Sequence, residues 1–307
     1  MKENKKYINV VPPTTQEGWK AFVEACDDDL EARMDAVAKA VAQTPGLKFI
    51  GLTGPTCAGK TTTARKLTSC LKEHGHRVHV ISIDDFYFDK SYLEKRADLD
   101  PNIEIDYDSE ETIDIDLLEE KVDQLLQYCE TQMPRFDFNT GMRCNGTVIK
   151  PEPQDLFLFE GIQILYPKVH RILNRGVYKS IYICPQSELV QGGEVFESNE
   201  IRLMRRLVRD SIHRSAKAEF TLYLWQSVRA NEDKNIFPHV HVCDYNIDST
   251  MPYEIGMLKP YLEELLSGFA ETDQFGKEAK EVLRQLQNIP SVSAEYIRPN
   301  SLYKEFI

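Results

Sequence analysis

The chain has 307 residues, and its 49 acidic and 37 basic side chains give it a formal net charge of −12. Apolar residues make up 42% of the chain and charged residues 28%, which are ordinary globular values. They exclude a disordered acidic chain and leave room for one large or two modest domains.

Charge and composition also limit the partners we expect. An acidic chain lacks the basic face that broad nucleic-acid binding requires. No uncharged apolar run approaches the ~18 residues of a membrane span, and the first residues lack the apolar stretch of a secretory signal. Seven scattered cysteines without metal-ligand spacing are typical of reduced thiols in the cytoplasm. We therefore expect a cytoplasmic protein without nucleic-acid or membrane partners, and a homo-oligomer remains open.

Residues 1–13 are predicted to be unstructured. From Thr15 to Gln43 apolar residues recur at three- and four-residue steps, which predicts a helix with one apolar stripe. The breaker cluster at residues 44–46 ends this helix. We expect residues 1–46 to form a helical extension that packs in front of the main domain.

From residue 47 short apolar runs alternate with helical patterns. The predicted strands are 47–53, 77–83, 155–162, 180–184 and 241–247, and the predicted helices are 60–73, 114–129, 199–214, 218–230, 253–267 and 277–287. This alternation indicates an α/β fold with a mostly parallel sheet and helices on both faces. Residues 133–153 predict an inserted β-hairpin that turns at residues 139–141. We expect the main domain to span 47–268, with a C-terminal helix and tail over 269–307.

Residues 54–61, GPTCAGKT, match the phosphate-binding pattern G-x-x-x-x-G-K-[ST] at every fixed position. A predicted strand leads into this loop and a predicted helix leads out of it, so the helix points its positive end at the anion. In this pattern Lys60 reaches the terminal phosphates and the Thr61 hydroxyl binds Mg²⁺. We therefore predict a site for ATP or GTP formed by Gly54, Pro55, Thr56, Cys57, Ala58, Gly59, Lys60, Thr61 and Thr62. Cys57 is either a reactive, regulatory thiol or a tolerated loop residue.

Acidic residues follow two of the predicted strands. Asp84 and Asp85 lie at the strand end where parallel sheets bind ligands, so one of them can accept the proton of a hydroxyl or hold Mg²⁺. The alternative is an Asp pair that only caps a turn. Glu160 ends an apolar strand and is either an Mg²⁺ ligand or an exposed strand-end residue. Aromatic side chains beside the Asp pair are expected to wall a pocket for a flat or sugar-like substrate: Phe86, Tyr87 and Phe88.

Residues 201–217 carry six basic side chains and one acid, Asp210, so this segment is locally +5. Its apolar residues fall on one side of a helix, and its arginines recur on neighbouring turns. The arginines either clamp a transferring phosphoryl group or form a solvated basic face. With Gly192-Gly193 as a hinge, we expect an Arg-rich helical lid.

These motifs resemble the uridine kinase and phosphoribulokinase family of P-loop kinases. The residues that carry the resemblance appear in the family's order over roughly 47–265: GPTCAGKT, SIDDFY, YDSEETID, PRFDF, FLFEGI and RRLVRD followed by Arg214. Residues 294–307 are similar to the tail of bacterial uridine-kinase-like proteins. The N-terminal module of those proteins, which resembles part of threonyl-tRNA synthetase, is absent or reduced here.

The resemblance implies phosphorylation of a sugar hydroxyl by ATP or GTP with Mg²⁺. It implies that Lys60, Asp84 and Arg209 are catalytic, with Asp84 as the base. Thr61, Asp84 and Glu160 would surround Mg²⁺, and Arg209 and Arg214 would face the phosphates. The residues expected at the acceptor are Asp84, Tyr87, Asp108, Phe136 and Arg206, with Asp108 on the ribose hydroxyls.

Some positions depart from the family pattern. Where uridine-cytidine kinases present a tyrosine and a histidine to the pyrimidine, this hairpin carries Phe136 and Gly141, which offer no side-chain hydrogen bond. Ser215 and Ala216 replace the Gly and Arg expected beside Arg214. The leading hypothesis is a small-molecule kinase for a nucleoside or sugar-like hydroxyl acceptor. The alternatives are a kinase for a phosphopentose or another sugar, and an NTP-binding regulatory protein without phosphotransfer.

Overall fold

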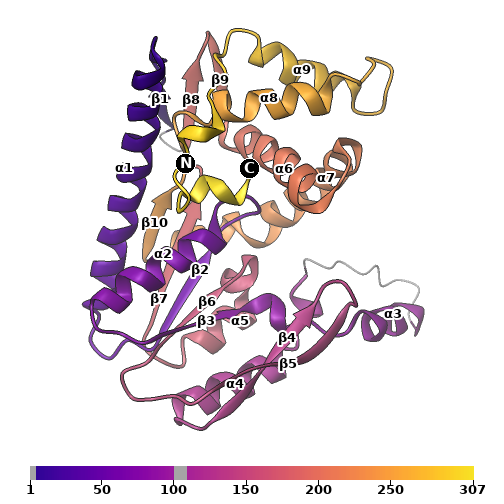
Figure 1. Cartoon of the computed structure of the whole chain (residues 1–307). Coiled ribbons are helices and arrows are strands. Elements are labelled where there is room, and N and C mark those ends of the chain that lie inside the picture. The colour runs from indigo at the N-terminus through magenta and orange to yellow at the C-terminus, as the bar shows by residue number, and fades with distance from the viewer. Residues whose placement is uncertain (1–4, 100–108) are drawn as a thin grey trace.

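A five-stranded sheet forms the centre of the computed structural model, which describes residues 5–99 and 109–307. Its strand order is β10-β7-β2-β6-β3, and every neighbouring pair is parallel (Figure 1). The strands are β2 (Phe49–Thr53), β3 (Val78–Ser82), β6 (Leu156–Glu160), β7 (Tyr178–Cys184) and β10 (Tyr245–Asp248). This confirms the predicted α/β class with a parallel sheet.

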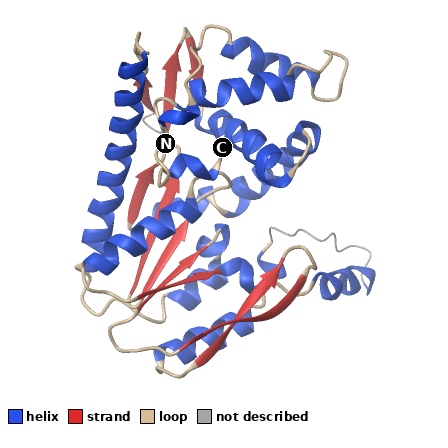
Figure 2. Cartoon of the chain, viewed as in Figure 1, coloured by secondary structure: helices blue, strands red, loops and turns tan. Residues whose placement is uncertain are grey.

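Helices cover both faces of this sheet (Figure 2). Alternate strand residues point to opposite faces, so Ile50 and Leu158 join one core cluster while Phe49 and Phe157 join the other. The helices that contribute to the first cluster are α1 (Gln16–Ala42), α2 (Lys60–Glu73), α6 (Ser198–Arg214), α7 (Ala218–Asn235), α8 (Glu254–Leu266) and α9 (Gly276–Leu286). The helices of the second are α4 (Ile115–Leu126) and α5 (Pro167–Leu173). A further helix is α3 (Lys90–Leu99). The helices and strands that the sequence predicted end within five residues of their observed boundaries, whereas α3 and α5 were not predicted.

The N-terminal helix α1 shares the core of the rest of the chain. Thr15 caps it by accepting a hydrogen bond from the Gly18 N–H at 3.1 Å. Its apolar stripe, which includes Leu30 and Met34, packs in one cluster with Leu286 of α9 and residues of the C-terminal segment. The division at 46/47 and 268/269 stays a prediction, but all three segments contribute to this cluster. Among the described residues, no helix is both long and apolar enough to cross a bilayer.

The prediction that residues 1–13 are unstructured is wrong for part of that segment. Lys6–Asn9 forms β1, which pairs in parallel with β8 (Ser187–Gln191), and β8 pairs with β9 (Glu194–Phe196) in a second, small sheet. The partner strand lies about 180 residues away in the sequence, so no local pattern could reveal the pairing.

The inserted hairpin is confirmed, whereas the glycine hinge is not. Strands β4 (Thr131–Asp137) and β5 (Met142–Ile149) pair antiparallel and project beside α4 (Figure 1). Gly192 and Gly193 form the turn between β8 and β9, with φ angles of 62° and 88°. Positive φ explains why both are glycine, so their role is a tight turn rather than a hinge.

Candidate active site

The phosphate-binding loop joins β2 to α2, as its sequence pattern predicts. Positive φ angles occur at Cys57, with 58°, and at Gly59, with 96°. A Cβ atom at Gly54 would lie 2.0 Å from the carbonyl oxygen of Ile183 on β7, so no larger residue fits there. The glycines therefore permit the tight backbone of a phosphate cradle at the start of α2.

The amine of Lys60 is folded back onto this loop. Its Nζ donates hydrogen bonds to the carbonyl oxygens of Gly54 and Pro55, at 2.8 and 3.0 Å. Burial lowers the pKa of the Lys60 amine, while the nearby carboxylates of Glu160 and Glu305 oppose that shift. Because a phosphate oxygen carries a full negative charge and a carbonyl oxygen only a partial one, an incoming phosphate is a better partner for the Lys60 ammonium than these carbonyls.

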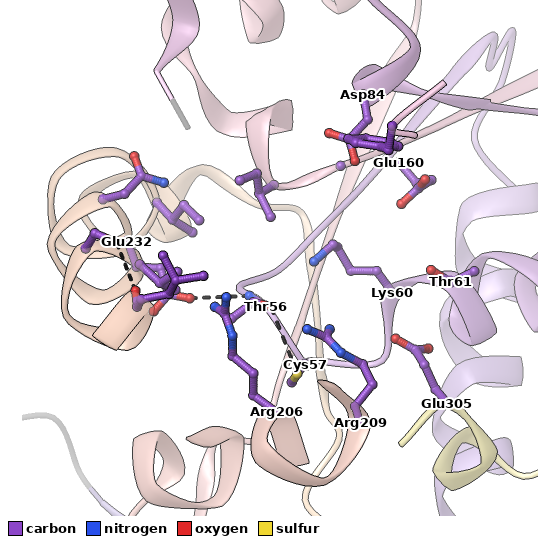
Figure 3. A pocket seen from close by; sticks show the side chains of 18 of the residues that line it. Thr56, Cys57, Lys60, Thr61, Asp84, Glu160, Arg206, Arg209, Glu232 and Glu305 are labelled. Carbon is purple, nitrogen blue, oxygen red and sulfur yellow. Dashed lines mark hydrogen bonds between the residues drawn. The ribbon is translucent and has the colours of Figure 1, made fainter. Parts of the chain in front are cut away.

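Asp84 and Glu160 lie next to one another at the carboxyl edge of the sheet (Figure 3). Glu160 is the last residue of β6 and is paired in register with Ser82, and Asp84 follows in the 3-10 helix η1 (Ile83–Phe86). Burial raises the pKa of the Glu160 carboxyl, and a hydrogen bond with Ser82 and the charge of Lys60 oppose that shift. A cation would relieve the cost of holding this half-buried carboxylate in its ionised form.

The chemistry of Thr61, Asp84 and Glu160 fits Mg²⁺. All three offer hard oxygen donors, and a Mg²⁺ ion that accompanies a nucleotide takes only one or two carboxylates from the protein, with phosphate oxygens and water completing its shell. Over residues 5–99 and 109–307 no cluster of three or more acidic, His or Cys side chains could hold a metal by itself. The hard oxygen donors of Thr61, Asp84 and Glu160 fit an ion whose shell a polyphosphate and water would complete.

Gln163, which the sequence analysis missed, connects two predicted site residues. Its side chain is fully buried in the 3-10 helix η3 (Ile162–Leu165). Its Nε2 donates to Asp84 Oδ1 at 2.8 Å and to the Tyr87 hydroxyl at 2.6 Å. A signal was present, because Gln163 is a lone amide in the apolar run that surrounds Glu160.

The two neighbouring aspartates have separate roles. Asp84 faces the cavity, whereas Asp85 Oδ1 accepts a hydrogen bond from the Phe136 N–H of the hairpin at 2.9 Å. Burial raises the pKa of the Asp85 carboxyl, and this backbone hydrogen bond opposes the shift. Asp85 therefore fixes the position of the hairpin relative to Asp84.

Three aromatic rings pack edge to face beside Asp84. The ring centroids of Tyr87 and Phe136 are 5.6 Å apart, those of Phe136 and Phe138 are 5.1 Å apart, and those of Tyr87 and Phe138 are 6.4 Å apart. Tyr87 and Phe138 line the cavity, and Phe136 supports both rings. They form an aromatic wall with the Tyr87 hydroxyl as its polar group.

Arg206, Arg209 and Arg214 of α6 line the opposite part of the cavity and share one acid, Asp210. The nearest atoms lie 3.3, 2.7 and 3.4 Å from the Asp210 carboxylate oxygens, respectively. The single Asp210 carboxylate can balance only one of these three guanidinium charges. This part of α6 is therefore suited to bind an anion.

The predicted residues surround one cavity of about 900 Å³ (Figure 3). Those that line it are Thr56, Cys57, Lys60, Thr61, Asp84, Tyr87, Glu160, Arg206, Arg209 and Arg214. The lining residues that the sequence analysis missed include Phe138, Glu232 and Glu305. Negative carboxylates and the phosphate loop thus face a group of arginines across a space large enough for a nucleotide and a second small molecule.

Comparison with known proteins agrees with this geometry. Residues 49–255 match the model of the "Phosphoribulokinase / Uridine kinase family". The chain belongs to this family. It is 32% identical over 165 residues to a uridine kinase of Lactobacillus helveticus, covering 53% of this chain and 67% of that protein. It is 29% identical over 182 residues to a uridine kinase of Clostridium perfringens, covering 59% and 76%.

A solved structure shares the fold of this family member. It is a proposed fructose transport system kinase from a Silicibacter species, with a TM-score of 0.51 and 20% identity, covering 69% of this chain and 98% of the other. This likeness confirms the predicted P-loop kinase fold. The family match and the uridine kinase relatives confirm the prediction of a phosphotransferase with a hydroxyl acceptor.

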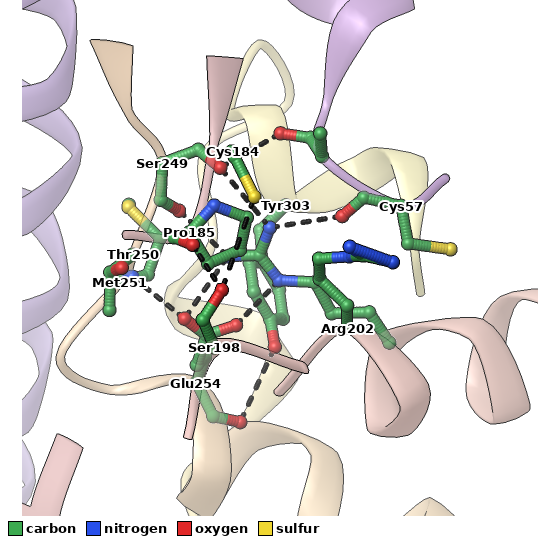
Figure 4. A network of polar contacts seen from close by, with 12 residues as sticks. Cys57, Cys184, Pro185, Ser198, Arg202, Ser249, Thr250, Met251, Glu254 and Tyr303 are labelled. Atoms are coloured by element: carbon green, nitrogen blue, oxygen red, sulfur yellow. Dashed lines mark hydrogen bonds and ion pairs between the residues drawn. The ribbon is translucent and has the colours of Figure 1, made fainter. Parts of the chain in front are cut away.

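Two arginines of the predicted clamp do not reach the cavity. Arg202 and Arg205 are fully buried and pair with Glu232 and Glu254, with N–O distances of 2.6 Å in each pair. Arg202 Nε also donates to the Thr56 carbonyl oxygen at 3.3 Å. Arg205 Nη1 donates to the Cys57 carbonyl oxygen at 3.2 Å, in a polar network that includes Ser249 and Glu254 (Figure 4). This half of α6 is therefore neither a solvated face nor a free lid but a support for the phosphate loop.

Other expected contacts of the acceptor pocket also differ. Phe86 is fully buried in the core rather than in the pocket wall, and Phe88 packs against the Tyr92 ring with centroids 4.8 Å apart. The Gly141 carbonyl accepts a hydrogen bond from the Lys90 N–H at 2.8 Å, so this residue serves the hairpin turn. Asp108 lies outside the described residues.

Proposed function

We propose that this family member is an Mg²⁺-dependent kinase that transfers the γ-phosphoryl group of ATP to a hydroxyl of a nucleoside or sugar-like acceptor. The observation that carries the proposal is that the Asp84 carboxylate faces the same cavity as Lys60 and the phosphate loop, while Gln163 fixes its orientation. The uridine kinases among its relatives support a nucleoside as the acceptor class.

The residues have complementary roles in this reaction. The acceptor hydroxyl donates a hydrogen bond to Asp84 and transfers its proton there as its oxygen attacks the γ-phosphorus in line. The bond from that phosphorus to the β-phosphate bridging oxygen breaks, and ADP leaves. Lys60 and Arg209 supply positive charge to the phosphoryl oxygens during transfer. Mg²⁺ held by Thr61, Glu160 and Asp84 would neutralise charge on the β- and γ-phosphate oxygens.

A different acceptor is the second candidate, and the aromatic wall favours it. Phe136 and Phe138 offer ring faces and edges but no hydrogen bonds to a base. With the Tyr87 hydroxyl as the polar group of this wall, the site discriminates weakly between related bases, because a wrong base leaves few buried polar groups unpaired. We therefore expect a broad preference for acceptors with a flat or apolar part beside the reacting hydroxyl.

Acceptor-dependent ADP release tests both candidates. Purified protein is assayed with MgATP or MgGTP and a panel of nucleosides, pentoses and phosphopentoses. Strong turnover of uridine and cytidine above all others would exclude the second candidate, whereas a preferred phosphopentose would establish it. Asp84→Asn should reduce turnover by about 10²-fold or more, since it removes the proton acceptor. Asp116→Asn, on the exposed side of α4, is the matched control and should keep wild-type turnover.

The cellular setting is part of the proposal. All seven cysteines are free thiols, which supports a reducing compartment such as the cytoplasm. The regulatory alternative without phosphotransfer is not favoured, because Lys60, Asp84 and Arg209 all line one cavity. ADP release that no acceptor stimulates would revive it.

A further inference from the structure

The C-terminal segment, residues 294–307, packs against the phosphate loop instead of leaving the domain. It contains the 3-10 helices η5 (Ala294–Tyr296) and η6 (Leu302–Glu305). Leu302, Tyr303 and Phe306 are buried in the main core cluster. The contact with the loop is close, because a Cβ atom at Gly59 would lie 2.6 Å from Leu302 Cδ1. The last turn of the chain is thus held at the start of α2.

This segment brings a carboxylate to the phosphate-binding groups. Glu305 Oε2 accepts a hydrogen bond from the Thr62 backbone N–H at 3.2 Å. Thr62 lies in the first turn of α2, where N–H groups have no partner within the helix and are the groups that hold a nucleotide phosphate. Figure 3 shows Glu305 entering the cavity beside Lys60 and Thr61. Glu305 therefore occupies a donor that a bound polyphosphate would use.

The charges around Glu305 also indicate that its carboxylate competes with a polyphosphate for the same groups. Its carboxylate interacts electrostatically with the Lys60 ammonium and with the Arg209 guanidinium, both predicted to face phosphates. Glu160 and Asp84 add further negative charge close to Lys60. An incoming polyphosphate thus meets a third carboxylate, and that carboxylate cannot remain at the Thr62 N–H when a phosphate oxygen binds there.

The N-terminal helix α1 holds this segment in place. Ser301 Oγ donates to Asp27 Oδ1 of α1 at 3.0 Å and accepts the Tyr303 N–H at 3.1 Å. Arg298 forms an ion pair with Asp28 of the same helix. These contacts fix the start of the segment, and Tyr303 and Phe306 are fully buried, so only the Glu305 side chain has to move to release the phosphate site.

We propose that Glu305 is an autoinhibitory phosphate mimic, whose carboxylate closes the nucleotide site until ATP displaces it from the Thr62 N–H. The proposal rests on the proposed function, because it requires that the phosphate loop bind a nucleotide. Glu305 lowers the apparent affinity for ATP, since part of the binding free energy is spent on displacing it. The position of α1 and the C-terminal segment then sets how readily the kinase binds its nucleotide.

Nucleotide affinity of Glu305→Gln tests the proposal. Binding of ATP, with and without Mg²⁺, and of inorganic tripolyphosphate is measured by calorimetry for the wild type, E305Q and E295Q. Glu295 is exposed in the same segment, so E295Q is the matched control. E305Q should bind ATP about tenfold more tightly, because the repulsion is removed and a charged hydrogen bond no longer has to be broken, and E295Q should match the wild type.

Each other outcome has a definite meaning. Unchanged or weaker ATP binding by E305Q would overturn the proposal, and weaker binding only with Mg²⁺ would instead make Glu305 a part of the metal site. No ATP binding by any of the three proteins would refute the proposed function itself. Amide hydrogen exchange of the unmodified wild type is a second measurement. Loss of the contact between Thr62 and Glu305 should loosen the last turn and speed exchange at residues 303–307 when ATP binds, and unchanged or slower exchange there would contradict the mechanism.

Discussion

Gln163 donates one hydrogen bond to Asp84 and another to Tyr87 from the same side-chain nitrogen, at 2.8 and 2.6 Å, while its own side chain is fully buried. A buried amide with two fixed partners restricts the rotation of both of them. The proposed base and the polar group of the aromatic wall are thereby held in one orientation. Gln163 is a positioning residue, because the cavity is lined by its partners and not by Gln163 itself.

Replacing Gln163 with methionine should reduce turnover without weakening ATP binding. Methionine keeps much of the volume but removes both donors, so Asp84 samples unproductive orientations. We expect kcat to fall about 10- to 100-fold, equivalent to ~1–3 kcal/mol. The KM for ATP should stay within about twofold, because the phosphate groups are untouched. Gln43→Met, on the exposed end of α1, is the control. A proportional rise in the ATP KM would contradict the positioning role.

Arg209 should matter most in the transition state. It lines the cavity, and its guanidinium is only partly neutralised by Asp210, which two other arginines share. Arg209→Ala should lower kcat about 10²- to 10³-fold, as expected for a lost donor to developing charge. Arg209→Lys should recover only part of this, because an ammonium lacks the guanidinium fork. Steady-state kinetics with Arg171→Ala as the exposed control measures both effects, and equal activity of all variants would refute the role.

Arg205 should contribute mainly to the stability of the folded protein, because it does not line the cavity. Its ion pair with Glu254 is fully buried on both sides, so removing one partner leaves an uncompensated buried charge. Arg205→Met should lower the free energy of unfolding by about 3–5 kcal/mol. The double variant Arg205→Met/Glu254→Met should recover most of that loss, because it buries no unpaired charge. Urea unfolding of the three proteins tests this, and a double variant less stable than Arg205→Met would contradict it.

Local patterns predicted most of the fold and the phosphate site. The glycine loop, the apolar strands and the amphipathic helices carry their signal within a few residues, so α2 and the sheet strands were predicted close to their observed ends. The pattern also located Lys60, Asp84 and Glu160, because the carboxyl ends of parallel strands meet at one edge.

Contacts between distant segments could not be predicted in this way. Arg202 and Arg206 look alike in the sequence, but one is fully buried against Glu232 and the other faces the cavity. The acids that bind the buried arginines lie on α7 and α8, so the sequence near Arg202 does not show that it pairs with Glu232, 30 positions further along the chain. The same holds for Glu305, whose contact with Thr62 joins residues 243 positions apart.

Asp27 should make stability depend on pH in a direction opposite to that of most carboxylates. It is buried on α1, Oδ1 accepts hydrogen bonds from Tyr253 and Ser301, and Oδ2 has no hydrogen-bond partner within residues 5–99 and 109–307. Burial raises the pKa of the Asp27 carboxyl, and the two hydrogen bonds oppose that shift. The folded state therefore favours the protonated form. The contribution of Asp27 to stability is full below its unfolded pKa, ~3.9, and is lost as pH rises through the folded value.

Asp27→Asn imitates the protonated form at every pH and tests this sign. Its oxygen still accepts from Tyr253 and Ser301, so the C-terminal segment keeps its contact with α1. Near pH 4 the variant and the wild type should have similar free energies of unfolding. By pH 8 the variant should be more stable by about 1 kcal/mol, because it buries no unpaired carboxylate oxygen. Denaturant unfolding from pH 4 to 8 measures the difference in free energy of unfolding between the variant and the wild type. If the variant loses stability relative to the wild type as pH rises, Asp27 is stabilised in its ionised form instead.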